Sequence, residues 1–238
     1  MTDQTNPADR VGWEAIWRSG KIPPRFQSLA APNATVVEWA DTLPKGAYIL
    51  DLGCGIGRHC VYLGGRGFRM AGLDISPTGI SVSQDVCAQR QIAFEGRVSD
   101  LTTIPWPDAT FDAALSTSTI HHNLRAGIVQ SIAEVRRVLK PGGLFLADFP
   151  CDNTEDFSGW REMVRNGQLV EAEMNTFIDE RPQPEGDDGH LPHHYSDETD
   201  VRDLLGAFEI LKLWTDVRSR TPEGAVQSAK WVAWARKP

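Results

Sequence analysis

Short apolar runs alternate with amphipathic stretches along the middle of the chain. Five apolar runs predict strands at 48–52, 68–74, 92–98, 111–116 and 144–149. Stretches of helical periodicity lie between them at 57–66, 77–91 and 125–139. In the last of these, Ile128, Ile132 and Val135 recur every three or four residues and form one apolar face. This alternation predicts an α/β fold, in which a mostly parallel sheet carries helices on both faces.

The two ends of the chain depart from this pattern. Trp13, Ile16 and Trp17 stand at helical spacing and Gly20 follows, while a second helix is predicted over 33–42. After Pro150 the chain is richer in acidic residues, glycine and proline, with a predicted helix at 158–166 and a strand at 171–180. A helix at 197–206 and a hairpin of strands at 208–217 and 227–236 follow. We expect a single domain over 1–238, with a helical lid at 1–45 and an inserted substrate flap at 151–195.

Composition narrows the classes of partner. The 238 residues carry a formal net charge of −8, which argues against a large basic face for nucleic acid. No apolar run approaches the roughly 20 residues of a membrane span, and the polar N-terminus lacks the apolar core of a signal peptide. The four cysteines show no C-x-x-C spacing. We therefore expect a cytoplasmic monomer or homodimer that acts on a small molecule, with no nucleic-acid or membrane partner.

A glycine-rich turn follows the first strand of the predicted sheet. Asp51 ends the strand, and Gly53, Gly55 and Gly57 alternate with other residues after it. Glycines let the backbone turn sharply and approach a ligand closely, and the helix that follows directs its first N–H groups into the same place. A dinucleotide site would follow G-x-G-x-x-G, but the third-glycine position holds Arg58 or Cys60, according to the glycine from which it is counted. The pattern is D-x-G-x-G-x-G instead.

Three further motifs follow in the order of the strands. Asp74 ends the second strand, where a carboxylate can accept both hydroxyls of an adenosine ribose. Asp100 and Leu101 follow the third strand. The sequence E-x-x-R-V-L-K-P-G-G, which begins at Glu134, precedes the fifth.

Together these motifs resemble class I S-adenosylmethionine (SAM)-dependent methyltransferases of the small-molecule type, over residues 46–150 in motif order. The resemblance implies a Rossmann-like sheet of seven strands in the order 3-2-1-4-5-7-6, with strand seven antiparallel, and SAM as cofactor. It also implies that the residues at these motifs line the SAM site: Asp51, Gly53, Cys54, Gly55, Gly57, Asp74, Ile75, Asp100, Leu101 and Ser116.

Two histidine clusters are candidates for the acceptor side of the site. His121 and His122 follow the fourth strand, and a histidine titrates near neutral pH, as a general base requires. Alternatively, one of them packs against the cofactor. The second cluster holds His193, His194 and Tyr195, and resembles the P-H-x-[FY] segment of many small-molecule methyltransferases. We expect no metal there, because adjacent histidines on a strand point to opposite sides.

The N-terminal segment offers further candidates for substrate contact. Trp13 and Trp17 share one helix face and resemble the N-terminal segment of thiopurine- and tellurite-type methyltransferases. They can cover the sulfonium of SAM by a cation–π contact or simply belong to the core. Arg25 can hold an anionic substrate or the carboxylate of SAM.

The expected reaction is methyl transfer from SAM to oxygen or nitrogen of a small-molecule metabolite. Transfer to sulfur or another chalcogen is an alternative that rests on the two tryptophans. A protein that binds SAM or S-adenosylhomocysteine (SAH) without methylating is an alternative of another class.

Overall fold

The computed structural model describes residues 7–18, 32–181 and 190–238. Its centre is a sheet of seven strands in the order β3-β2-β1-β4-β5-β10-β9. The strands are β1 (Tyr48–Leu52), β2 (Arg69–Asp74), β3 (Phe94–Val98), β4 (Phe111–Ser116), β5 (Leu139–Pro150), β9 (Glu209–Arg220) and β10 (Val226–Arg236). Neighbouring strands from β3 to β5 are parallel, whereas β10 is antiparallel to both β5 and β9. This is the predicted order 3-2-1-4-5-7-6, so the fold prediction is confirmed.

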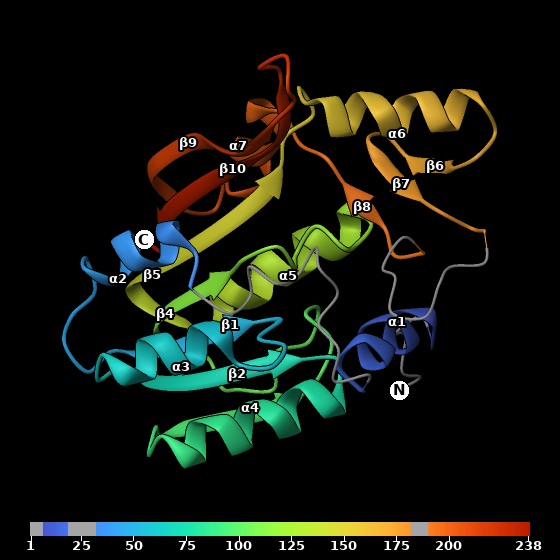
Figure 1. The fold of residues 1–238 in the computed structure, drawn as a ribbon. Helices are drawn as coiled ribbons and strands as arrows, with labels where there is room; N and C mark the ends of the chain where they lie inside the picture. The colour runs from blue at the N-terminus through green and yellow to red at the C-terminus, as the bar shows by residue number, and fades with distance from the viewer. Residues whose placement is uncertain (1–6, 19–31, 182–189) are drawn as a thin grey trace.

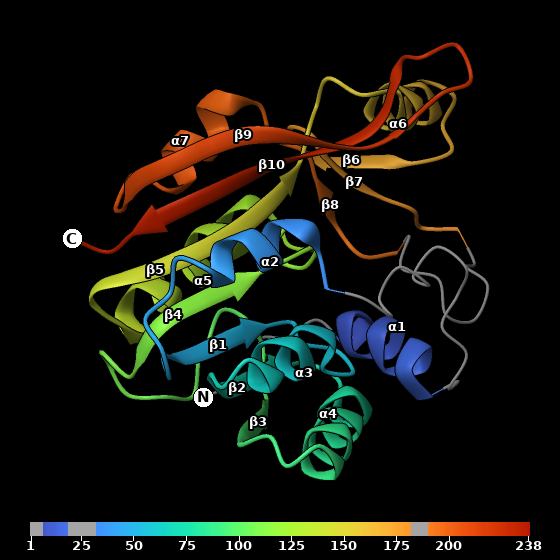
Figure 2. The ribbon, with the colours of Figure 1, turned by 60° about the vertical axis from the view of Figure 1, so that its left-hand side comes forward.

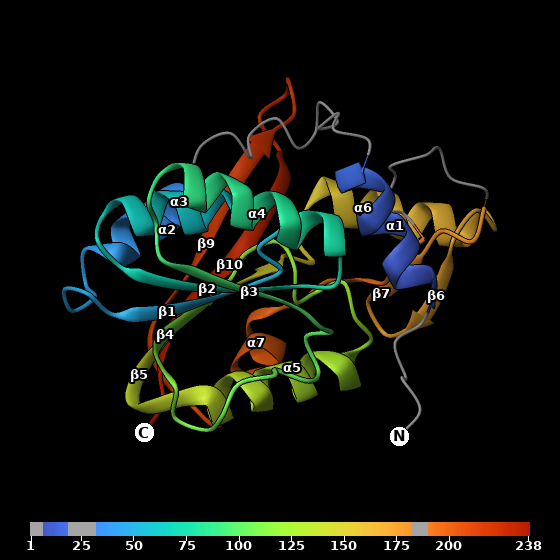
Figure 3. The same ribbon diagram turned by 90° about the horizontal axis from the view of Figure 1, so that it is seen from below.

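Helices cover both faces of the sheet (Figure 3). One face carries α2 (Ala34–Ala40), α3 (Arg58–Gly65) and α4 (Pro77–Gln89), and the other carries α5 (Arg125–Val138) and α7 (Glu198–Leu204). Successive strand residues enter different cores, since Ile49 packs with the α2–α4 side and Leu50 with the α5–α7 side. The strands read as continuous apolar runs because both of their faces are buried.

The segments outside this core gather on one side of the molecule (Figures 1 and 2). They are α1 (Pro7–Arg18), α6 (Glu155–Arg165) and a small antiparallel sheet of β6 (Val170–Glu173), β7 (Thr176–Ile178) and β8 (His193–His194). By contrast, α2 contributes Val36 and Trp39 to the core. A lid within the first 45 residues would therefore be formed by α1 rather than α2.

The structure differs from the local predictions in two places and adds one strand. The strand predicted over 171–180 is the hairpin β6–β7, which turns at Asn175 with φ of 60°. The two-residue strand β8 was not predicted. Strand β5 begins at Leu139 instead of 144, because the Pro-Gly-Gly segment stays within it as an irregularity in the pairing with β4. None of the helices in the described part of the chain has the length and apolar character needed to cross a bilayer.

Candidate active site

The glycine loop after β1 needs its glycines for two separate reasons. Gly53, Gly55 and Gly57 have φ of 68°, 53° and 85°, a region that favours glycine. A Cβ on Gly53 would also lie 2.1 Å from Cγ2 of Thr119, and one on Gly55 would lie 2.8 Å from the Trp17 ring. The loop is therefore packed from both sides.

Asp74, at the end of β2, holds the loop in place. Its carboxylate accepts hydrogen bonds from the backbone N–H of Gly55 (2.8 Å) and of Ser76 (2.9 Å). Burial raises the pKa of Asp74 to about 6. The carboxylate thus joins the glycine loop to the start of α4.

Asp51, which the resemblance assigns to the SAM site, is buried. It is 2% exposed and lies beneath the loop, where its Oδ2 is 3.5 Å from Cys60 Sγ and 4.0 Å from His59 Nδ1. Burial raises its pKa to about 7. Its visible role is to support the first turn of α3 from below.

A cavity opens above the glycine loop. Ten of the predicted site residues line it: Trp13, Trp17, Gly53, Cys54, Gly55, Asp74, Ile75, Asp100, Leu101 and His122. Seven others do not: Asp51, Gly57, Ser116, His121, His193, His194 and Tyr195. Arg25 lies outside the described residues.

The cavity wall also includes residues that were not among the predicted site residues: Ile56, Arg58, His59, Ser99, Thr117, Ser118, Thr119, Asn123 and Leu191. Most of these residues could have been predicted from a general rule, because ligands of such sheets bind beyond the carboxyl ends of the strands. Thr117 to Thr119 directly follow β4, and Arg58 and His59 open α3. Leu191 comes from a distant segment, and no sequence signal pointed to it.

Helix α1 is fastened to the start of α4. The Glu14 carboxylate accepts hydrogen bonds from the Thr78 N–H (3.1 Å) and from the hydroxyls of Ser76 and Thr78 (2.5 and 2.6 Å). Its position suits the partial positive charge of a helix N-terminus. On the same helix, the rings of Trp13 and Trp17 are stacked with centroids 6.2 Å apart. Glu14 therefore holds the two tryptophans over the cavity.

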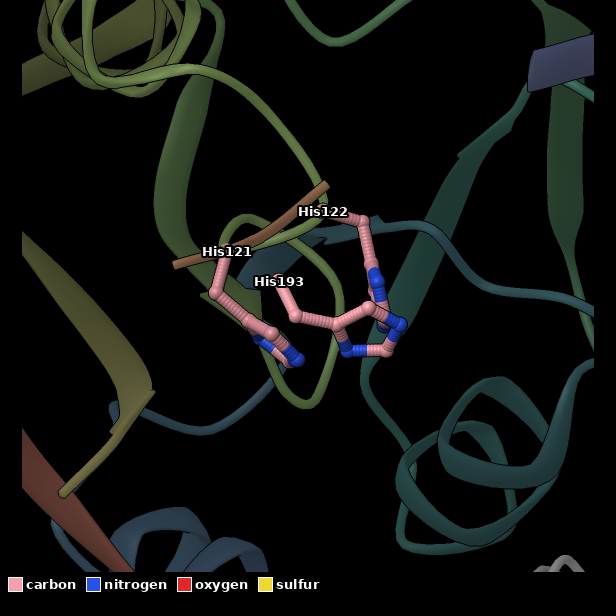
Figure 4. Close-up of side chains that lie close together, drawn as sticks. All are labelled: His121, His122 and His193. Atoms are coloured by element: carbon pink, nitrogen blue, oxygen red, sulfur yellow. The ribbon is translucent and has the colours of Figure 1, made fainter. Parts of the chain in front are cut away.

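Three of the histidines, His121, His122 and His193, lie close together (Figure 4), whereas His194 is separate from them. The rings of His121 and His122 lie 4.1 Å apart, and the His193 ring is 4.6 Å from that of His122. The His194 ring turns the other way, with Nδ1 2.7 Å from Thr176 Oγ1 and Nε2 3.0 Å from Asp200 Oδ2. Adjacent residues on β8 thus point apart, as predicted.

Aromatic rings continue from this cluster into the flap. The His193 ring is 4.8 Å from Trp160 of α6, and Trp160 lies near Phe177 and Tyr195. Tyr195 is 8% exposed and packs among these rings. Its position makes it part of the structure of the flap rather than of the cavity wall.

Comparison with known proteins agrees with the fold and the loop. A family profile described as "Methyltransferase domain" matches residues 50–147. YqeM of Bacillus subtilis, which carries a methyltransferase name, is 32% identical over 168 residues, covering 62% of this chain and 67% of that protein. The tRNA (carboxymethyluridine(34)-5-O)-methyltransferase ALKBH8 of Macaca fascicularis is 32% identical over 150 residues, or 61% of this chain. The chain spans only 21% of the length of that relative.

A solved structure shows the same fold. The 1,6-didemethyltoxoflavin-N1-methyltransferase of Burkholderia thailandensis, with bound SAH, aligns with a TM-score of 0.67 at 17% identity, covering 93% of this chain and 83% of that one.

The strand order and the glycine loop define the Rossmann-like fold of class I methyltransferases. The chain belongs to the SAM-dependent methyltransferase family.

The Gly53→Ala substitution tests the loop. We expect it to weaken SAH binding at least ~10-fold, because its Cβ meets Thr119 and the loop must shift (1.4 kcal/mol corresponds to tenfold). Gly46→Ala is the matched control, with φ of 71° and nothing within 4 Å of an added Cβ. Both variants should lose about 1–2 kcal/mol of stability through backbone strain. Equal SAH affinity of the two variants by calorimetry would contradict the prediction.

The Glu14→Gln substitution tests the docking of α1. The variant keeps the size of the side chain but loses the charge at the start of α4, worth about 0.3–1 kcal/mol in such a position. We expect SAH affinity to fall about two- to fivefold while the melting temperature changes little. The control is Glu38→Gln on α2, away from the cavity. A loss of affinity shared by both variants would count against a specific role for α1.

His59 predicts a pH dependence of stability. Burial lowers its pKa from 6.5 to about 3. As the pH falls below 6.5, the unfolded chain binds a proton at His59 and the folded chain does not, so this residue costs up to about 1.4 kcal/mol of stability per pH unit. We expect urea unfolding to show that the wild type loses stability relative to His59→Gln as the pH falls from 6.5 toward 4. Parallel stability curves would refute the assignment.

Proposed function

We propose that the chain transfers a methyl group from SAM to an oxygen or nitrogen atom of a small-molecule acceptor. One observation carries the proposal: a single cavity runs from the glycine loop and Asp74 to His122 and Asn123 after β4. The adenosine of SAM would lie toward Asp74, Asp100 and Leu101. Its sulfonium would lie beneath Trp13 and Trp17, which leaves the methyl group to face the turn after β4.

The acceptor side of the cavity suits an organic molecule. The Trp13 ring meets His122 edge-on at 5.3 Å, and rings continue through His193 to Trp160. Flat rings of this kind supply apolar contact area together with a few ring nitrogens that can form hydrogen bonds. An acceptor held there would present its nucleophilic atom to the methyl group of SAM.

The chemical demand on the protein is modest. The sulfonium already activates the methyl group, so the site must align the acceptor atom with the carbon–sulfur bond and exclude water. An oxygen or nitrogen acceptor also has to lose a proton. Burial holds the pKa of His121 well below its ordinary value, which makes it a weak base. Among the two histidines after β4, His122 is the one on the cavity wall.

The names of the compared proteins include both oxygen and nitrogen acceptors, as in the N1-methyltransferase of Burkholderia thailandensis. The name of the ALKBH8 relative specifies transfer to oxygen, although its substrate is a tRNA. The net charge of −8 in this chain favours a small acceptor over a nucleic acid.

Binding of SAH tests the proposed cofactor site. We expect SAH to bind with a Kd of tens of micromolar or tighter, and Asp74→Asn to weaken binding at least ~10-fold, since a hydrogen bond to a charged group contributes about 1.5–3 kcal/mol. Asp112→Asn is the control, because this carboxylate bonds the Tyr48 N–H and Lys140 away from the cavity. Equal effects of the two substitutions in calorimetry would contradict the proposed ribose contact.

Turnover separates an enzyme from a protein that only binds the cofactor. SAH release should be measured with a panel of small hydroxyl, carboxyl, amine and thiol acceptors. We expect release with oxygen or nitrogen acceptors. SAH binding without release on any acceptor would favour the non-catalytic alternative, and release with thiols alone would favour sulfur transfer.

A further inference from the structure

Two histidine groups that are far apart in the sequence meet beside the cavity. His121 and His122 follow β4, and His193 belongs to β8. One ring nitrogen from each lies within 4.8 Å of those of the other two (Figure 4). Three imidazoles in one place form a donor set typical of zinc and related metal ions.

The backbone explains how neighbouring residues share one site. His121 and His122 lie in a turn, where Ser118 has φ of 53° and the His122 N–H donates to the Thr119 carbonyl (3.0 Å). A turn does not impose the alternation of a strand, so both rings reach the same place. The His194 N–H donates to the His121 carbonyl (3.0 Å), which fixes β8 beside the turn.

The side chain of His194 braces this arrangement. It lies between Thr176 and Asp200, and Asp200 also pairs with Arg125 at 2.9 Å. With β8 held on one side by this network, the alternation of the strand leaves His193 directed toward His121 and His122. The three side chains are therefore positioned before any ligand arrives, which lowers the cost of binding.

His121 adds an independent sign of a missing ligand. The residue is 4% exposed, and its Nδ1 has no hydrogen-bond partner among the described residues. A buried polar atom left unsatisfied costs about 1–3 kcal/mol. A ligand bound at Nδ1 would remove that cost.

The distances suit a metal ion after a small adjustment. Zinc binds histidine nitrogen at about 2.0–2.1 Å in tetrahedral geometry, which places the nitrogens roughly 3.4 Å apart. Side-chain rotation of the three rings has to close the present separation of up to 4.8 Å by little more than 1 Å.

We propose that His121, His122 and His193 bind a divalent transition-metal ion of the zinc type, with an open position toward the cavity beside His122. Three protein ligands and one open position are typical of a metal that acts on a substrate. The sequence predicts no metal; the two histidine groups lie far apart in the chain, and only the fold brings them together.

The role of the ion rests on the proposed function. An acceptor hydroxyl bound at the open position releases its proton to water, because the metal lowers its pKa. The resulting oxyanion forms a bond to the methyl carbon of SAM, and the carbon–sulfur bond breaks with its electron pair going to sulfur. The products are the methylated acceptor and neutral SAH.

Metal titration tests the site without SAM. The chain is freed of any affinity tag, stripped with a chelator and titrated with Co²⁺, and then with Zn²⁺ against a competing indicator. We expect one equivalent to bind and to give the visible spectrum of four-coordinate cobalt. His193→Ala should weaken binding at least ~100-fold, beyond the effect of losing an outer-shell partner. His190→Ala, which removes a histidine of the same segment outside the cluster, should bind as the wild type does.

Absence of saturable binding at micromolar metal, or equal affinities of the His193→Ala and His190→Ala variants, would overturn the proposal. X-ray absorption of the zinc-loaded wild type gives a second reading that does not depend on how the variants fold. Three imidazole ligands support the site, and any other number overturns it. Metal binding without turnover would refute the proposed function alone, whereas turnover in a chain that binds no metal would refute the metal site alone.

Discussion

One buried carboxylate connects the parts of the cofactor site. Asp74 accepts from Gly55 on the glycine loop and from Ser76 at the start of α4. The Ser76 hydroxyl in turn accepts from the Gly79 N–H, which caps α4, and donates to Glu14 of α1. A continuous path of hydrogen bonds therefore runs from the loop to the helix that carries the two tryptophans. Bonds to a charged acceptor of this kind are among the stronger ones in proteins.

Burial affects the charge of the two carboxyl groups near the glycine loop. Asp51 lies beneath the glycine loop and Asp74 lies beside it, and burial raises the pKa of each. A carboxyl group in such surroundings keeps its charge only if hydrogen bonds or cations stabilise it. The backbone N–H groups of Gly55 and Ser76 supply that stabilisation for Asp74, and Arg58 lowers the pKa of Asp51. The conformation of the loop and the ionisation of Asp74 thus depend on each other.

The sequence predicts best what depends on local periodicity. Continuous apolar runs gave the five parallel strands, and three alternating glycines gave the loop, because each signal lies within a few residues. The missed features depend on contacts between distant segments. Strand β8 has two residues and pairs with β7, so no periodicity reveals it. The sequence pattern of α1 indicates a role for its tryptophans but none for Glu14. The role of Glu14 depends on Ser76 and Thr78, which are more than sixty residues away in the chain.

The turn after β4 belongs to both halves of the site. Thr119 presses against Gly53, which fixes the glycine loop from above, and His122 lines the cavity beside it. Through its carbonyl, His121 holds β8 and with it the flap. A displacement of this turn would therefore move the loop and the histidine cluster together. Because interfaces packed this tightly transmit shifts rather than absorb them, the cofactor side of the cavity and its acceptor side are mechanically coupled through a few residues that follow one strand.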